Sequence, residues 1–238
     1  MMNRMPVLMI LAAVMTLSVG ARAERVEVGL AATPTWLFDS GYAAFSEGDL
    51  FVGRLGVDIR SQVGTVGGFQ FAPLLGYRFG KDSGFLTWDI DTYLYTHDVY
   101  AGLRVRRELI SWLSLFVEID AGAMIAVMDA DMYVGGDDPA YSGEPKDAYS
   151  DTGATWNVSA LFGVETHLSR RWLESRGNDW FCFGGEIAVG YARRGDISFD
   201  PSLNGGSDNA ISSETLGEWG DVNLSGLIVQ FAASLYFI

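Results

Sequence analysis

The sequence predicts an all-β fold, namely an eight-stranded antiparallel up-and-down transmembrane β-barrel. The chain has 238 residues, of which 49% are hydrophobic and 13% aromatic. After residue 23, however, no apolar run reaches the roughly 18 residues that a membrane-spanning helix needs. The hydrophobic residues instead lie in short segments that alternate with polar residues, which is typical of membrane-spanning β-strands.

The first 23 residues have the pattern of an export signal. Arg4 precedes the uncharged apolar run Val7–Val19, and the small-x-small triplet Ala21-Arg22-Ala23 is followed by the charged Glu24. The apolar run is too short to span a bilayer, so a cleaved secretory signal peptide explains it better than an anchor. We therefore expect a signal peptide over residues 1–23, cleaved after Ala23, and one barrel domain over 24–238. An uncleaved segment lying in the membrane interface is the alternative.

Charge and cysteine content exclude several function classes. The formal net charge is −14, from 16 Lys and Arg against 30 Asp and Glu, and such a chain repels the phosphates of nucleic acid. The lone cysteine, Cys182, excludes an intramolecular disulfide and a cysteine-based zinc cluster. The sequence thus predicts no nucleic-acid partner, no cofactor and no metal site.

Eight segments show period-two alternation, each about as long as a tilted membrane strand. In the last segment, Phe231, Leu235 and Phe237 share one face, and Gln230 and Ser234 share the other. The expected strands lie near Arg25–Trp36, Phe51–Ser61, Phe69–Phe79, Tyr93–Arg106, Leu113–Ala123, Trp156–Thr166, Phe181–Tyr191 and Leu227–Ile238.

The connections alternate between short and long. Short turns are expected at Ser61–Gly67 and Glu108–Trp112, and Ser169–Asp179 is longer than a typical turn. Long loops are expected at Leu37–Leu50, Gly80–Asp91, Met128–Thr155 and Arg194–Asp221. Short periplasmic turns and long outer loops are typical of outer-membrane barrels, and both chain ends then fall on the turn side.

Alternation alone does not decide which face is inside, but two further patterns favour an apolar outer face. Charges of both signs occur in mid-strand on the polar face, where a closed lumen can pair them. Aromatic residues gather at strand ends, as in a membrane-interface girdle. The predicted lumen charge network comprises Arg54, Asp58, Arg60, Arg78, Asp98, Arg104, Arg106, Glu118, Asp120, Glu165 and Glu186. The predicted membrane-interface aromatics are Trp36, Tyr77, Phe79, Tyr93, Trp112, Trp156 and Tyr191.

The signal peptide, the strand number, the loop asymmetry and the closing "FAASLYFI" together resemble the small outer-membrane β-barrel family typified by the N-terminal barrel of OmpA and by OmpX. The resemblance implies a location in the bacterial outer membrane, in contact with outer-membrane lipid and lipopolysaccharide. It also implies folding by the barrel-assembly machinery, which reads an aromatic residue at the end of the chain. Phe237 is that residue here, although Ile238 follows it. The extracellular partner is not identified by this resemblance, because fold does not give function.

We expect a non-enzymatic, porin-like barrel with an envelope-structural or surface-interaction role through its acidic outer loops, and a lumen plugged by ion pairs. The loops Met128–Thr155 and Arg194–Asp221 are rich in Asp and Glu, but neither has the spacing of a known calcium loop. Leakage of small ions through the lumen is a lesser alternative.

Two other functions remain as alternatives. A lipid-modifying barrel enzyme would use His167 or His97, because His167-Leu168-Ser169 has the H-x-S spacing of outer-membrane lipid A deacylases. We nevertheless expect no catalytic residue, since His167 is predicted near the periplasmic rim. A soluble, lipocalin-like periplasmic barrel would bind a small apolar ligand in an apolar interior.

Overall fold

A computed structural model of the chain describes residues 25–38, 51–87, 90–133, 145–167, 181–199 and 221–237. The expected signal peptide, Ser169, Ile238 and most residues of the expected loops therefore lie outside the described residues. Within the described part of the chain, no helix is long and apolar enough to cross a membrane.

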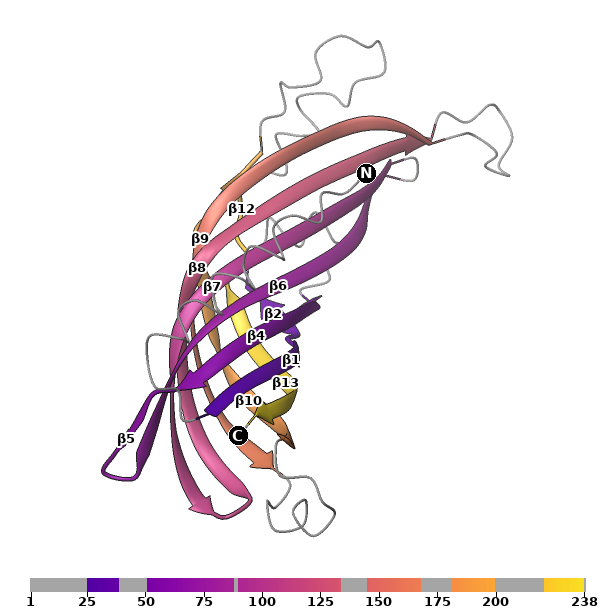
Figure 1. The fold of residues 1–238 in the computed structure, drawn as a ribbon. Coiled ribbons are helices and arrows are strands. Elements are labelled where there is room, and N and C mark those ends of the chain that lie inside the picture. Colours follow the sequence, from indigo (N-terminus) through magenta and orange to yellow (C-terminus); the bar gives the residue numbers. More distant parts are fainter. Residues whose placement is uncertain are drawn as a thin grey trace.

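Eight long strands form one antiparallel sheet that closes on itself (Figure 1). Neighbouring strands in the sheet are consecutive along the chain, and β13 pairs back onto β1, with Val28 opposite Leu235. This closure confirms the predicted eight-stranded antiparallel barrel. The barrel strands are β1 (Arg25–Ala32), β4 (Arg54–Gln62), β6 (Phe69–Thr87), β7 (Ile90–Ile110), β8 (Leu113–Tyr133), β9 (Pro145–His167), β10 (Phe181–Arg194) and β13 (Gly226–Phe237).

Short strands extend the barrel at its ends. β2 (Thr35–Leu37) continues β1 beyond a break at Pro34, whose carbonyl oxygen accepts a hydrogen bond from the Val229 amide at 3.0 Å. β5 (Gly64–Val66) forms a hairpin with β6, and its turn residues Gly67 and Gly68 have φ of 60° and 82°. Such positive φ values suit glycine, which has no Cβ to clash with the backbone. The other short strands are β3 (Phe51–Val52), β11 (Ile197–Ser198) and β12 (Asp221–Val222).

Four strands extend far into segments that the sequence predicts to be loops. β6 and β7 extend through the expected loop Gly80–Asp91, and β8 and β9 occupy much of the expected loop Met128–Thr155. In Figure 1, these four strands rise well beyond the rest of the barrel and bend over. The loop expectation was wrong there because acidic residues can take the outward positions of a strand. Asp129, for instance, alternates with the buried Met128 and Ala130.

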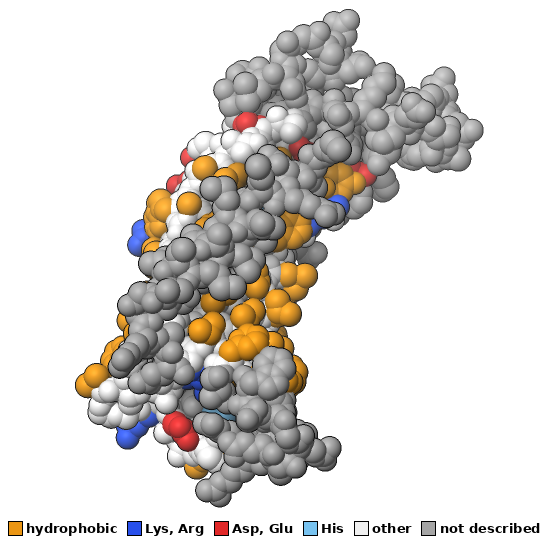
Figure 2. All heavy atoms as spheres, in the orientation of Figure 1, with side chains coloured by type: hydrophobic (Ala, Val, Ile, Leu, Met, Phe, Trp, Pro, Cys, Tyr) orange, Lys and Arg blue, Asp and Glu red, His pale blue; other side chains and the backbone are white. Residues whose placement is uncertain are grey.

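The closed sheet places its apolar face outward. Leu30, Leu55 and Ile119 are exposed by 63%, 68% and 56%, whereas Arg60, Arg104 and Glu165 are at most 1% exposed. Figure 2 shows hydrophobic side chains gathered over the middle of one face, with acidic side chains visible only toward its upper and lower ends. The alternative of a soluble barrel with an apolar interior is not supported by this arrangement.

Candidate functional site

The lumen carries a dense set of ion pairs on the side of the short turns. Arg60 on β4 binds Asp58 on the same strand, with Nε 2.7 Å from Oδ1. Its Nη1 also donates to the carboxylates of Glu27 on β1 and Glu186 on β10. One guanidinium thereby joins three strands of the barrel, as the bidentate fork of arginine permits.

Arg104 on β7 makes a second junction at the same level. Its Nε donates to Oε2 of Glu118 at 2.8 Å, and its Nη2 donates to Oε2 of Glu186 at 2.8 Å. The guanidinium carbon lies 3.9 Å from the ring centroid of Phe116, which adds a cation–π contact. Glu165 lies 3.5 Å from Arg104 Nη1.

Arg106 completes this group nearer the turns. Its Nη1 donates to Oε1 of Glu165 at 3.1 Å and lies 3.5 Å from Oε2 of Glu27. The amides of Gln62 and Gln70 also accept hydrogen bonds from Arg106. We call the group the turn-side charge cluster: Glu27, Asp58, Arg60, Arg104, Arg106, Glu118, Glu165 and Glu186.

A second group lies nearer the long loops. Arg78 on β6 donates to Oδ2 of Asp120 at 2.9 Å and lies 3.6 Å from Oδ2 of Asp98. Asp98 also accepts a hydrogen bond from the amide of Asn157. Arg54 and Arg194 are buried in the same part of the lumen, close enough to Asp98 to interact with it electrostatically. We call Arg54, Arg78, Asp98, Asp120 and Arg194 the loop-side charge cluster.

The two clusters carry opposite excess charge. The turn-side charge cluster has five carboxylates and three arginines, whereas the loop-side charge cluster has three arginines and two carboxylates. An apolar layer covers the loop-side charge cluster toward the loops, and we call it the apolar plug. It comprises Leu37, Val52, Leu94, Met124, Ala126, Met128, Ala130, Ile197, Val222 and Leu224. The described lumen also holds a second buried apolar cluster, Phe116, Leu161, Ala188, Ala192 and Ile228. An interior filled by side chains is expected for a narrow eight-stranded barrel.

All eleven charged residues predicted for the lumen lie at buried inward positions. Two members of the clusters are absent from that prediction. Glu27 lies between the outward Val26 and Val28, so alternation was sufficient to find it. Arg194 was assigned to a loop, because the strand ending at Tyr191 was expected to be three residues shorter than β10 is.

Glycines on inward positions make room for large interior rings. A Cβ at Gly76 would collide with the ring of Tyr100, and a Cβ at Gly163 or Gly184 would lie 2.6 Å from the ring of Phe116 or Tyr236, respectively. Tyr100 in turn lies under the guanidinium of Arg78, 3.7 Å from ring centroid to carbon. The small residues of the sequence therefore set where the charged layer can pack.

Six of the seven predicted interface aromatics lie on outward strand positions, and the seventh, Trp112, lies in a turn. Trp36, Trp112, Trp156 and Tyr191 are exposed, and Tyr77, Phe79 and Tyr93 are half-buried. Trp112 lies in the β7–β8 turn, whereas Trp36 packs edge-on against Phe51 near the loop-side end of the wall. An amphipathic ring at each end of an apolar wall is the arrangement found at membrane interfaces.

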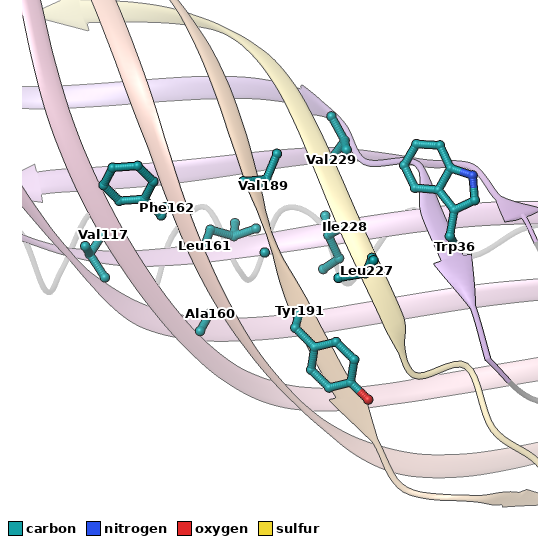
Figure 3. A pocket seen from close by; sticks show the side chains of 11 residues that line it. Trp36, Val117, Ala160, Leu161, Phe162, Val189, Tyr191, Leu227, Ile228 and Val229 are labelled. Atoms are coloured by element: carbon teal, nitrogen blue, oxygen red, sulfur yellow. The ribbon is translucent and has the colours of Figure 1, made fainter.

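A shallow groove of about 600 Å³ lies on the outward wall, across β8, β9, β10, β13 and β2. Ala160 lies directly opposite Tyr191 in the strand pairing, and its small side chain leaves the space between larger neighbours. Figure 3 shows Phe162, Val229, Trp36 and Tyr191 around this space. The lining is almost entirely apolar, so the groove suits hydrocarbon rather than a polar substrate.

Neither histidine lies in a catalytic arrangement among the described residues. His97 is on the outward face, where its Nδ1 is 2.6 Å from the Tyr77 hydroxyl and its ring packs 5.2 Å from that of Phe79. His167 is the last residue of β9, on the turn side, and its ring lies edge-on to that of Tyr236. No described serine or carboxylate completes a nucleophile–base pair with either ring.

Among the residues that the structure describes, one group of carboxylates is close enough to hold a metal ion. Oxygen atoms of Glu27, Glu165 and Glu186 lie within 4.8 Å of one another. The guanidiniums of Arg60, Arg104 and Arg106 already contact these three carboxylates. The group is therefore satisfied by the protein's own cations.

Comparison with known proteins identifies only similar shapes. No family model matches the chain, and no curated protein matches it. Among solved structures, the chain is similar to Ail, the attachment invasion locus protein of Yersinia pestis, at 11% identity and a TM-score of 0.41, over 90% of this chain and 98% of that chain.

Two further solved structures are similar at the same level. Neisserial surface protein A shares 13% identity at a TM-score of 0.37, over 90% of this chain and 95% of that chain. CarO2 of Acinetobacter baumannii shares 12% identity at a TM-score of 0.32, over 90% of this chain and 100% of that chain. Likeness of this degree says nothing about activity, and the barrel is established by the strand pairing of the chain itself.

Proposed function

We propose that this chain is a non-enzymatic β-barrel of the bacterial outer membrane, with an envelope-structural or surface-interaction role at its loop-side end. The observation that carries the proposal is the direction of the side chains across the closed sheet. Charged residues face the lumen and apolar residues face outward, which reverses the order of a water-soluble barrel. A closed barrel also leaves no unpaired sheet edge, as a hydrocarbon environment requires.

Contact with lipid accounts for the outward wall. Soluble proteins rarely expose contiguous apolar patches larger than a few hundred Å², and this wall continues around the strands. In this proposal the wall contacts outer-membrane lipid and lipopolysaccharide, and the aromatic residues Trp36, Trp156 and Tyr191 lie at the outer interface.

Export and assembly are part of the same proposal. Residues 1–23 direct export, and Phe237 is the signal read by the barrel-assembly machinery. The side chain of Phe237 faces outward on β13, opposite Val26 on β1 and Phe181 on β10. Because these pairings close the barrel, Phe237 lies at the seam where assembly ends.

The test combines membrane fractionation with migration of boiled and unboiled samples on SDS gels. We expect the parent chain in the outer-membrane fraction, with a mobility shift on boiling. Ile119→Asp places a charge on the lipid-facing wall and is expected to abolish the shift, whereas Thr65→Asp on the exposed β5 hairpin is expected to retain it. Recovery of the parent chain in the aqueous periplasm without a shift would contradict the proposal.

Orientation is tested by labelling intact cells with a membrane-impermeant maleimide. In a Cys182→Ala background, Ser150→Cys places a thiol on the exposed loop-side part of β9, and Thr65→Cys places one on the turn side. We expect labelling at position 150 alone, and labelling at position 65 after cell lysis. Labelling at position 65 in intact cells would invert the proposed orientation.

A further inference from the structure

Arg54 is a buried cation whose guanidinium group has no hydrogen-bond acceptor among the described residues. Its exposed fraction is 2%, and none of its three guanidinium nitrogens has a hydrogen-bond acceptor. Arg60, Arg78, Arg104 and Arg106, by contrast, each lie in an ion pair. Asp98 interacts with Arg54 electrostatically but accepts no hydrogen bond from it. A buried guanidinium group without acceptors is costly, so Arg54 favours an acceptor of negative charge that the described side chains do not supply.

Other donors converge on the same place. Gly80 lies between Arg54 and Thr96 in the strand pairing, and a Cβ there would be 3.0 Å from Arg54 Cγ and 2.7 Å from Thr96 Oγ1. The Thr96 hydroxyl is buried and has no hydrogen-bond partner. Nε of Arg194, in the same cluster, is also without an acceptor. Besides the Arg54 guanidinium, one hydroxyl and one further guanidinium N–H of this part of the lumen thus have no acceptor among the described residues.

The net charge of the loop-side charge cluster indicates the charge of an anion that would neutralise it. Arg54, Arg78 and Arg194 face Asp98 and Asp120, which leaves an excess of one positive charge. Neither carboxylate accepts a hydrogen bond from Arg54, although Asp98 Oδ2 has no hydrogen-bond partner among the described residues. Asp120 accepts from Arg78 and from the Ser159 hydroxyl at 2.6 Å, and Asp98 accepts from Asn157. One monovalent anion neutralises the cluster, and a divalent oxyanion would overcompensate it.

We propose that the loop-side half of the lumen binds one small monovalent anion of the size of chloride, held by the guanidinium of Arg54 and the hydroxyl of Thr96. The apolar plug covers this position toward the loops and separates it from outer solvent. A halide suits such a place because it accepts hydrogen bonds from all directions and brings no further donors or acceptors to satisfy. The bound ion is then part of the lumen packing.

The first test measures the unfolding temperature of the refolded full chain in detergent, in chloride and in gluconate at equal ionic strength. We expect chloride to raise the unfolding temperature in a saturable manner, as binding to the folded state requires. Arg54→Met should be at least as stable as the parent in gluconate and should lose the chloride dependence. Arg193→Met, which removes an exposed outward arginine, should retain it.

Chloride dependence that persists in Arg54→Met, or that is missing in the parent chain, would overturn the site. If the Arg54→Met variant does not fold, the anion can be located crystallographically in the unmodified chain. Crystals grown in bromide should show an anomalous peak within hydrogen-bond distance of the Arg54 guanidinium. A carboxylate of residues 39–50, or water alone, in that position would overturn the proposal. Neither result would affect membrane fractionation, so the proposed function is tested separately.

Discussion

Arg104 and Glu186 join opposite sides of the barrel through the lumen. Arg104 Nη2 on β7 donates to Glu186 Oε2 on β10 at 2.8 Å, and neither side chain is exposed. The two strands are separated by β8 and β9 in the sheet, so the pair crosses the interior rather than following the wall. Such a pair contributes little by itself, but removing one partner leaves a buried charge without compensation.

Arg104→Met is therefore expected to lower the free energy of unfolding by about 3–5 kcal/mol, because Glu118 and Glu186 lose a shared cation. Denaturant unfolding in detergent micelles measures this change. Arg107→Met is the matched control, since Arg107 is exposed and makes only a cation–π contact with Phe69 at 5.3 Å. The control should cost about 1 kcal/mol or less. An equal decrease in the free energy of unfolding of both variants would show that the buried ion pairs of the lumen contribute no more than an exposed contact does.

Ile119→Arg probes the outward wall. Ile119 is 56% exposed in the middle of β8, and a cation at mid-membrane depth of a barrel is expected to cost about 2–4 kcal/mol. Val66→Arg, on the β5 hairpin beyond the wall, should change stability by about 0.5 kcal/mol or less. Unfolding in lipid vesicles measures both. A wall that tolerates arginine at position 119 would not be in contact with hydrocarbon.

Gly122→Ala probes the close approach of β8 to β7. A Cβ at Gly122 would overlap the backbone carbonyl of Val99 and lie 2.7 Å from Tyr100 Cα, and backbone atoms cannot move aside as a side chain can. We expect Gly122→Ala to lower the free energy of unfolding by about 1–3 kcal/mol or more, as overpacking of a protein core does. Gly53→Ala meets nothing within 4 Å and should be neutral. Heat-modifiable migration of the two variants separates these outcomes.

His97→Ala and His167→Ala test the enzyme alternative. Because His97 bonds to Tyr77 on the outward wall and His167 packs on Tyr236, we expect the lipid A species of cells expressing either variant to match those of the parent. Mass spectrometry of extracted lipid A measures this. A lipid A modification that depends on the parent chain and is lost in either variant would support the enzyme alternative.

Alternation was sufficient to place most side chains correctly. Arg60 and Asp58 share a face with Arg54, and Leu55 and Val57 share the other, as the sequence alone indicates. Local pattern failed at the strand ends. The segment Met128–Thr155 is expected to be a loop between two alternating segments, yet its residue Asp129 lies on an outward position of β8 and fits a strand.

Pairing within the lumen was beyond the reach of sequence reasoning. Arg60 contacts Glu186, which is 126 residues away. Arg54 donates no hydrogen bond to a carboxylate of the described residues, although Asp58 lies four residues further along the strand. Both facts depend on how far each strand is shifted against its neighbour around the closed sheet. A shift of two residues preserves the face of every side chain but exchanges its partners across the lumen.

The sequence by itself determined the number of barrel strands and the polar and apolar faces of each. Successive side chains of a strand point to opposite faces, so the alternation of polar and apolar residues can be recognised from the sequence alone. Closure of the sheet decided the rest. Only once β13 pairs with β1 does the polar face become an interior, with Arg104 and Glu186 within hydrogen-bond distance of each other. In that interior, Arg54 has no hydrogen-bond acceptor among the described side chains. These are relations between strands far apart in the chain, and they exist only in the closed barrel.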